Sequence, residues 1–174
     1  MTSKDLTADE SATRQALHNL LVTYARGADR GDEAIMRSAF HPDARMETGL
    51  ADAAIDRYVP AMVGRTRADF RTVFHSISNE RVAIDGDRAR GECYVFAYAL
   101  TNGNAPLELM AGGRYLDRFE RRGGCWLIAH RLYVQDWKTT RSVDTPPPEM
   151  GSPTGPVRGG FFPDDPALGF WSND

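Results

Sequence analysis

Asp29 and His75 are the two side chains of this sequence whose types could together perform general acid–base chemistry. Asp29 directly follows the apolar positions of a helical pattern, so we expect it at the edge of a buried helix face. His75 lies in an apolar segment that we expect to form a strand. A carboxylate beside an imidazole fixes the tautomer of the ring and strengthens it as a base, as general base catalysis requires. By spacing alone, a histidine in an apolar strand is more often a core residue, and an aspartate near a helix end is more often a solvated charge or a cap.

The helix that must carry Asp29 is predicted over residues 9–30, where apolar side chains recur at steps of three and four. Thr7 and Glu10 are spaced as a capping box ahead of it. Tyr24 is a third candidate, because it lies near the same end of the helix. A short helix over 32–40, a loop at 41–43, a strand at 44–48 and a third helix over 51–68 should follow, and Pro60 should kink or split that third helix.

After residue 70 the apolar period changes from 3.6 to 2, which predicts strands over 72–78, 81–85, 88–101, 107–121 and 125–137. Helices followed by long antiparallel strands indicate an α+β fold in which a curved antiparallel sheet wraps around the N-terminal helices. Along residues 93–100 neither face of the strand is polar. We therefore expect a second subunit, or alternatively the chain's own tail, to cover the outer face of the sheet.

Length and charge limit the function classes. The 174 residues fit one domain, and a net charge of −3 without a basic stripe argues against nucleic acid as the main partner. No segment approaches the ~20 apolar residues of a membrane span, and the N-terminus lacks the apolar region of a signal peptide. These features predict a cytoplasmic protein in which Cys93 and Cys125 are reduced and buried in strands.

We divide the chain into a flexible N-terminus (1–8), a barrel domain (9–140) and a proline- and glycine-rich C-terminal arm (141–174). Seven of the ten prolines lie in residues 138–174, so we expect no regular element there. The same segment carries Phe161, Phe162, Phe170 and Trp171. These aromatic side chains predict an arm docked on its own domain or on a neighbour, the alternative being a frayed terminus.

Motifs for several other chemistries are absent from the sequence. The four histidines have neither the spacing nor the cysteine companions of a zinc site. The sequence contains no glycine-rich phosphate loop, no Walker-type lysine and no GxSxG nucleophile elbow. We therefore predict no metal, nucleotide or flavin cofactor.

Several segments resemble SnoaL-like domains of the nuclear transport factor 2-like superfamily. They are the runs YARGADRGD (24–32), FHPDA (40–44), FHSISN (74–79), DGDRA (85–89), GRYLDRFE (113–120), GGCW (123–126) and DW (136–137). The resemblance extends over residues 9–140 and implies the cone-shaped α+β barrel of that superfamily. It is more specific for the superfamily than for a reaction.

Within the superfamily the sequence looks most like scytalone dehydratase, hexachlorocyclohexane dehydrochlorinase and bile-acid 7α-dehydratase, which are lyases without a cofactor. Their shared pair is an aspartate at the end of the first helix and a histidine on the strand after the third. The resemblance implies that Asp29 and His75 are this pair, and that Tyr24 lies in the pocket as in some members.

Part of the family pattern does not carry over. Several members have a further histidine or aspartate on the long middle strand, where this sequence offers only Tyr94 or Tyr98 as a hydrogen-bond donor to a leaving hydroxyl. Arg131 could neutralise developing negative charge, or it could be an outward strand arginine. The candidates for an apolar pocket lining, each of which could equally be a core residue, are Leu21, Tyr58, Met62, Phe96, Met110, Tyr115 and Trp137.

These features predict a lyase in which His75, oriented by Asp29, removes a proton from a hydrophobic cyclic molecule such as a steroid or polyketide. An isomerase or cyclase could use the same base, and only the lyase product loses mass. A second class is non-catalytic, since small subunits of ring-hydroxylating dioxygenases share this fold as scaffolds. We expect the chain to form a homo-oligomer, a dimer or a trimer.

Overall fold

The computed structural model describes residues 6–48, 52–143, 157 and 159–171. Its helices are α1 (Ala8–Arg30), α2 (Glu33–Ser38), α3 (Ile55–Asp69) and α4 (Pro166–Trp171). Two short strands, β1 (Phe40–Glu47) and β2 (Asp52–Ala54), lie between α2 and α3. Four long strands follow α3, namely β3 (Phe70–Asp85), β4 (Arg88–Thr101), β5 (Leu107–Arg122) and β6 (Cys125–Ser142).

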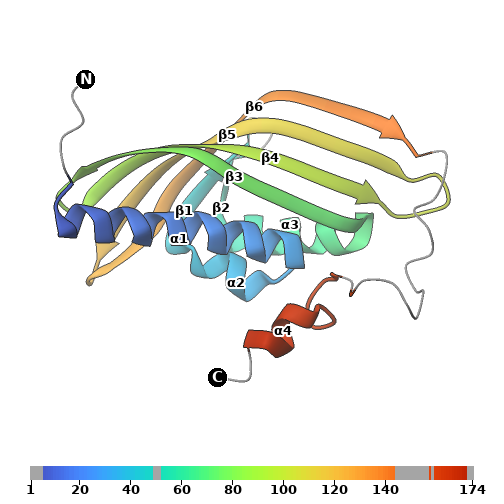
Figure 1. The fold of residues 1–174 in the computed structure, drawn as a ribbon, viewed down its shortest axis with the longest axis horizontal. Coiled ribbons are helices and arrows are strands. Elements are labelled where there is room, and N and C mark those ends of the chain that lie inside the picture. Colours follow the sequence, from blue (N-terminus) through green and yellow to red (C-terminus); the bar gives the residue numbers. More distant parts are fainter. Residues whose placement is uncertain (1–5, 49–51, 144–156, 158, 172–174) are drawn as a thin grey trace.

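The strands form one curved sheet in the order β2-β1-β6-β5-β4-β3, with β2 and β3 at its edges. Helices α1, α2 and α3 lie beneath the sheet, which arches over them (Figure 1). This confirms the predicted α+β class with a sheet wrapped around N-terminal helices. The sheet is not wholly antiparallel, because β1 pairs with β6 in parallel.

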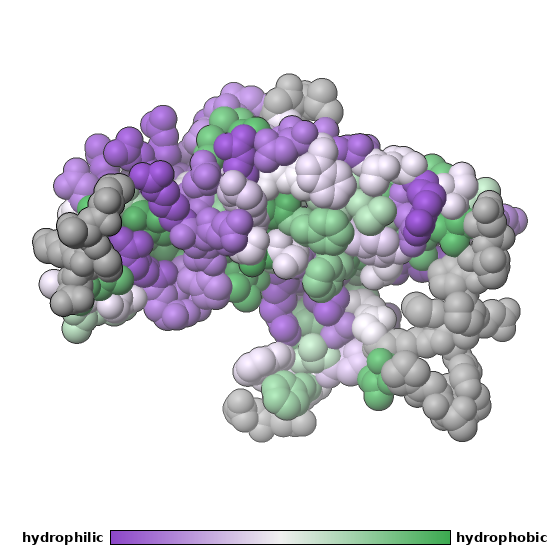
Figure 2. All heavy atoms as spheres, turned by 45° about the horizontal axis from the view of Figure 1, so that its top comes forward, coloured by the Kyte–Doolittle hydropathy of each residue, from purple (hydrophilic) through white to green (hydrophobic). Residues whose placement is uncertain are grey.

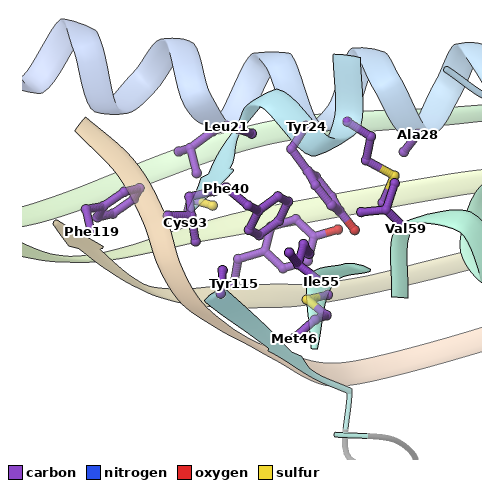
Figure 3. Packing of buried hydrophobic residues seen from close by; sticks show 14 of the residues in the cluster. Leu21, Tyr24, Ala28, Phe40, Met46, Ile55, Val59, Cys93, Tyr115 and Phe119 are labelled. Atoms are coloured by element: carbon purple, nitrogen blue, oxygen red, sulfur yellow. The ribbon is translucent and has the colours of Figure 1, made fainter. Parts of the chain in front are cut away.

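The core lies between the helices and the inner face of the sheet. Leu17, Leu21, Tyr24 and Ala28 form a buried stripe along α1, at the spacing that the sequence shows. Figure 3 shows Leu21 and Tyr24 pointing from α1 towards the strands. The predicted capping box at the start of α1 is confirmed, since the Glu10 amide donates to Thr7 Oγ1 at 3.1 Å and the Thr7 amide donates to Glu10 Oε2 at 2.9 Å.

Gly27 allows α2 to approach the last turns of α1. A Cβ atom on Gly27 would lie 2.4 Å from the backbone nitrogen of Met36, which real contacts do not tolerate. We expect Gly27→Ala to lower the free energy of unfolding by about 1–3 kcal/mol, because α2 must move away. Gly64 in α3 has open space around it, so Gly64→Ala should instead raise that free energy by about 0.4–1 kcal/mol. Urea unfolding of both variants measures the difference, and equal effects would contradict the close packing.

Several predicted boundaries are wrong. Residues 52–54, predicted as helix, pair with β1, and residues 41–43, predicted as a loop, belong to β1 itself. The two predicted strands 72–78 and 81–85 are one strand, interrupted by an irregularity next to Asn79, whose φ is 52°. Pro60 does not split α3. Cys125 is exposed rather than buried, because it begins β6 at the end of the sheet directly after a glycine turn.

The described part of the C-terminal arm docks on its own domain. Phe162 is buried, and its backbone amide donates to the carbonyl of Arg30 at 2.9 Å. The Arg30 side chain pairs with the buried Asp165 at 3.2 Å. Helix α4 shows that the prediction of no regular element in the arm is wrong.

The outer face of the sheet carries exposed aromatic side chains. Phe74, Tyr94, Phe96 and Trp137 are between 39% and 54% exposed. In Figure 2 pale and green residues gather over the middle and right of the molecule, whereas the left is mostly purple. The apolar outer face expected from the sequence is therefore present, and nothing in the described part of the chain covers these four side chains. Among the described helices, none is long and apolar enough to cross a membrane.

Candidate active site

The Asp29 carboxylate holds His75 through two hydrogen bonds. Since β3 is an edge strand, the backbone amide of His75 is free to donate to a partner outside the sheet. That amide donates to Asp29 Oδ2 at 3.1 Å, and His75 Nδ1 lies 2.6 Å from Asp29 Oδ1. The side chain of His75 is only 9% exposed and that of Asp29 only 12%. One carboxylate at the end of α1 thus fixes both the backbone and the ring of His75.

This contact decides the tautomer of the imidazole. An ionised carboxylate only accepts hydrogen bonds, so Nδ1 of a neutral His75 must carry the proton. The lone pair then lies on Nε2, which has no hydrogen-bond partner among the residues that the structure describes. A neutral imidazole with a free, oriented Nε2 can take up a proton from a substrate.

His75 borders two hollows. The apolar hollow, of about 150 Å³, lies between α3 and strands β3, β4 and β5, and the larger polar groove, of about 380 Å³, lies between α1 and β3. Met62, Thr66 and Val73 line the apolar hollow together with His75, and Arg26 and Arg30 line the groove. Both are open to the surface, so His75 does not lie in a closed cavity.

The apolar hollow exists because small side chains meet at this point of the sheet. Ala97 and Ala99 on β4 and Ala111 on β5 line it, and Ala97 lies directly opposite Ala111. Alanine leaves space that a larger residue on these positions would fill. Sequence reasoning did not assign these residues, although the alternation along β4 placed both alanines on one face.

Tyr24 and Tyr58 place two phenol groups deeper in the core. Their hydroxyl oxygens are 3.4 Å apart, and Tyr58 lies one turn of α3 before Met62. Burial, together with the neighbouring Tyr24, raises the pKa of Tyr58 well above its ordinary value. The Tyr58 phenol therefore stays neutral and can donate a hydrogen bond.

Arg131 is fully buried and belongs to a charged pair. Its Nε and Nη2 donate to the two oxygens of Asp117, both at 2.7 Å, and its guanidinium lies about 4 Å from the ring centres of Tyr24 and Tyr115. Figure 3 shows these two rings beneath α1, and they pack edge to face with their centres 5.5 Å apart. Burial lowers the pKa of Arg131, but Asp117 more than offsets this and holds the pKa above its ordinary value.

Arg131 does not point outward from its strand, because its side chain is completely buried, so that alternative is wrong. Within the described chain Nη1 is buried without a hydrogen-bond partner, and Arg131 lines neither hollow beside His75. Asp117, which sequence reasoning missed, is recognisable as an acid that alternates with the buried Tyr115 and Phe119 on one face of β5.

Five predicted site residues lie on the outer face of the sheet, away from Nε2 of His75, because they alternate with residues that face the helices. They are Tyr94, Phe96, Tyr98, Met110 and Trp137. The rings of Phe96 and Trp137 contact each other at 6.2 Å. Tyr98 borders the apolar hollow, but its hydroxyl donates to Glu108 at 3.1 Å. Their assignment to a pocket shared with His75 is therefore corrected.

The remaining lining candidates divide into two groups. Met62 lines the apolar hollow. Leu21 and Tyr115 are buried in the core, and Tyr58 packs against it. Of the adjacent pair Arg114 and Tyr115, Tyr115 faces inward, because Arg114 pairs with Asp136 at 3.0 Å. The described residues contain no group of three or more side chains that could hold a metal ion.

The helices beneath an open, curved sheet define a fold of the nuclear transport factor 2-like type. A model of the SnoaL-like domain matches residues 9–132, and the chain belongs to this family. A search of curated proteins finds no match.

Solved structures share this fold at low sequence identity. A candidate scytalone dehydratase from Novosphingobium aromaticivorans is 18% identical with a TM-score of 0.71, over 84% of this chain and 99% of that one. A type 2 hexachlorocyclohexane dehydrochlorinase is 20% identical with a TM-score of 0.72, over 82% and 98%. A protein from Kribbella flavida is 20% identical with a TM-score of 0.68, over 74% and 94%. At these identities the likeness concerns the fold alone.

Proposed function

We propose that this chain is a cofactor-independent lyase of the dehydratase type that acts on a hydrophobic cyclic substrate. The observation that carries this proposal is the double hydrogen bond from His75 to Asp29, which leaves Nε2 free beside an apolar hollow. The family to which the chain belongs, and neighbours that carry dehydratase and dehydrochlorinase names, are consistent with it.

In the proposed reaction Nε2 of His75 removes a proton from a carbon of the substrate. Asp29 stays ionised and stabilises the imidazolium that forms. The electron pair of the broken C–H bond forms a double bond, and the leaving group departs from the adjacent carbon. When this group is a hydroxyl, it takes the proton from the His75 imidazolium and leaves as water, which returns the imidazole to its neutral form.

Tyr24 and Tyr58 line neither hollow beside His75. They are the proposed hydrogen-bond donors to a leaving group or carbonyl that reaches past the hollow into the core between α1 and α3. They replace Tyr94 and Tyr98 in this role, because the latter lie on the outer face. Arg131 places a fixed positive charge behind Tyr24, which favours negative charge that develops near the phenol groups.

The size of the apolar hollow restricts the substrate. A volume of about 150 Å³ matches cavities that hold a single benzene-sized ring. We therefore propose that one ring of the substrate enters the hollow and that the rest of a larger molecule, such as a steroid or a polyketide, extends through the opening. A substrate with a single ring would also fit the hollow, so the activity assay must include single-ring compounds as well as steroids and polyketides.

The test is incubation of the protein in D₂O with hydroxylated single-ring compounds, steroids and polyketide intermediates, followed by mass spectrometry. A lyase gives a product that has lost water or another small group. Gain of deuterium without this loss indicates an isomerase or cyclase that uses the same base. No change with any compound, together with co-purification of a larger iron-containing subunit, would support a scaffold and contradict the enzyme proposal.

We also propose that a second copy of the chain, in a dimer or a trimer, covers the part of the outer face that carries the exposed Phe74, Tyr94, Phe96 and Trp137. The charges beside the aromatic residues are already neutralised within the chain, by the pairs of Arg114 with Asp136 and of Glu108 with Arg141. An identical face therefore meets no unpaired charge at these positions.

Phe96→Asp is expected to separate the subunits, because it buries a charge in the contact between copies. Sedimentation velocity should show an oligomer for the wild type and a monomer for the variant. Phe170→Ala in the exposed part of α4 is the control and should leave the oligomer intact. A monomeric wild type would contradict the proposal.

A further inference from the structure

A third hollow, of about 460 Å³, lies on the outer face of the sheet. Its lining residues belong to the part of β3 to β6 that leads to the β3–β4 and β5–β6 hairpin turns, at the left of Figure 1. Its polar lining includes Arg81, Arg90, Arg118 and His130, which belong to four neighbouring strands. His75 is not part of it. This part of the surface is therefore distinct from the candidate active site and lies towards the hydrophilic side of Figure 2.

Two of these arginines are direct neighbours across the sheet. Arg90 on β4 lies opposite Arg118 on β5, and Arg118 lies opposite His130 on β6. Side chains at such positions start about 5 Å apart, and like charges placed there destabilise a sheet. The fold therefore holds together cations that repel one another.

The arginines of the hollow differ from other exposed arginines of the same sheet. Arg114, Arg121 and Arg122 each pair with an acidic side chain at 3.0 Å or less. In the described ranges of the chain, neither Arg90 nor Arg118 makes a side-chain hydrogen bond or ion pair, and the same holds for Arg81.

Two acidic residues line the hollow beside these cations. Glu92 lies opposite Arg81 in the sheet and its carboxylate is 3.8 Å from Arg114, whereas both oxygens of Asp117 hold the buried Arg131. The Glu47 carboxylate contacts His130 at 2.8 Å. The three free guanidinium groups thus give the hollow a positive charge that these acids do not fully cancel.

We propose that this hollow binds a ligand that carries a diphosphate group. Guanidinium groups bind phosphate through paired hydrogen bonds, and neighbouring arginines can contact both phosphates of one diphosphate. A single carboxylate would leave at least one of the three guanidinium groups without a partner.

The volume and the walls of the hollow fit a small molecule. About 460 Å³ lies within the range of small-molecule sites. Leu116 and Leu132 line the hollow beside the arginines and offer an apolar surface to an organic part of the ligand, such as the base of a nucleotide. Inorganic diphosphate and a nucleoside diphosphate share the chemistry that the arginines recognise, and their affinities distinguish the two sources.

The test is isothermal titration of the full chain with inorganic diphosphate, ADP and adenosine at low ionic strength. We expect both phosphate compounds to bind and adenosine not to bind. Tighter binding of ADP than of diphosphate would assign the site to a nucleotide, and the reverse order would assign it to the inorganic ion. Arg90→Gln and Arg118→Gln should each weaken binding about tenfold or more, because a charged hydrogen-bonding group is lost.

Arg114→Gln is the matched control, because Arg114 lies on the same face but is already paired with Asp136. Thermal unfolding provides a second measurement. Without ligand, Arg118→Gln should be at least as stable as the wild type, since a repulsion is removed. With diphosphate, the wild type should gain more stability than the variant.

The proposal is overturned if the wild type binds neither phosphate compound, or if the variant with both Arg90→Gln and Arg118→Gln binds them as tightly as Arg114→Gln does. Binding of a single-stranded oligonucleotide without binding of either diphosphate would also overturn it and would indicate a nucleic-acid surface. None of these measurements depends on turnover at His75, so the two proposals fail separately.

Discussion

Replacing His75 by alanine is expected to abolish elimination of any substrate that the wild type converts. General acid–base catalysis contributes about 10²–10⁴-fold to a rate, and the variant should lose at least this factor in kcat. The measurement is product formation by mass spectrometry, with deuterium exchange into the substrate as a second readout. Added imidazole should restore part of the rate, because the substitution leaves space for a free base beside Asp29.

Asp29→Asn tests how His75 is oriented. The amide group of asparagine can donate to Nδ1, so the ring would carry its proton on Nε2 and lose the free lone pair. We expect a loss of similar order to that of His75→Ala, with little change in thermal stability. Ser78 is an exposed residue of β3, the strand that carries His75, so Ser78→Ala is the control and should keep the full rate. Unchanged turnover in both active-site variants would remove His75 from the mechanism.

Replacing Asp117 by alanine is expected to have the largest effect on stability. Arg131 is completely buried, and Asp117 provides both of its hydrogen-bond acceptors at 2.7 Å. Removal of the carboxylate leaves a buried charge without a partner, which typically costs about 3–5 kcal/mol. Chemical unfolding of the variant should show this decrease in the free energy of unfolding.

The double variant Asp117→Leu with Arg131→Met separates the charge from the packing. Replacing both partners of a buried ion pair by apolar residues is often neutral or stabilising. We therefore expect the double variant to recover most of the stability that Asp117→Ala loses. If Asp117→Ala unfolds at the same denaturant concentration as the wild type, the carboxylate of Asp117 does not stabilise the buried Arg131.

Local sequence patterns were sufficient for much of the fold. The stripe of Leu17, Leu21 and Tyr24 predicted α1, and the change of period after residue 70 predicted the long strands. Boundaries failed where pairing overrode local preference, as at residues 52–54, which continue a helical pattern but form an edge strand against β1. In the sequence, the irregularity at Asn79 looks like a gap between two strands, because a sequence does not show that both segments pair with the same neighbour, β4.

The sequence by itself determined the residue types of the site, the α+β class and the apolar character of both faces of the strand along residues 93–100. Its resemblance to a family pointed to Asp29 and His75, which lie 46 positions apart. Only the tertiary structure decided which face of the sheet each side chain occupies. Tyr94 and Tyr98 lie on the outer face and Arg131 inside, because the register between strands sets the direction of every side chain. The same register brings Arg90 next to Arg118, a juxtaposition of residues 28 positions apart that no local pattern contains.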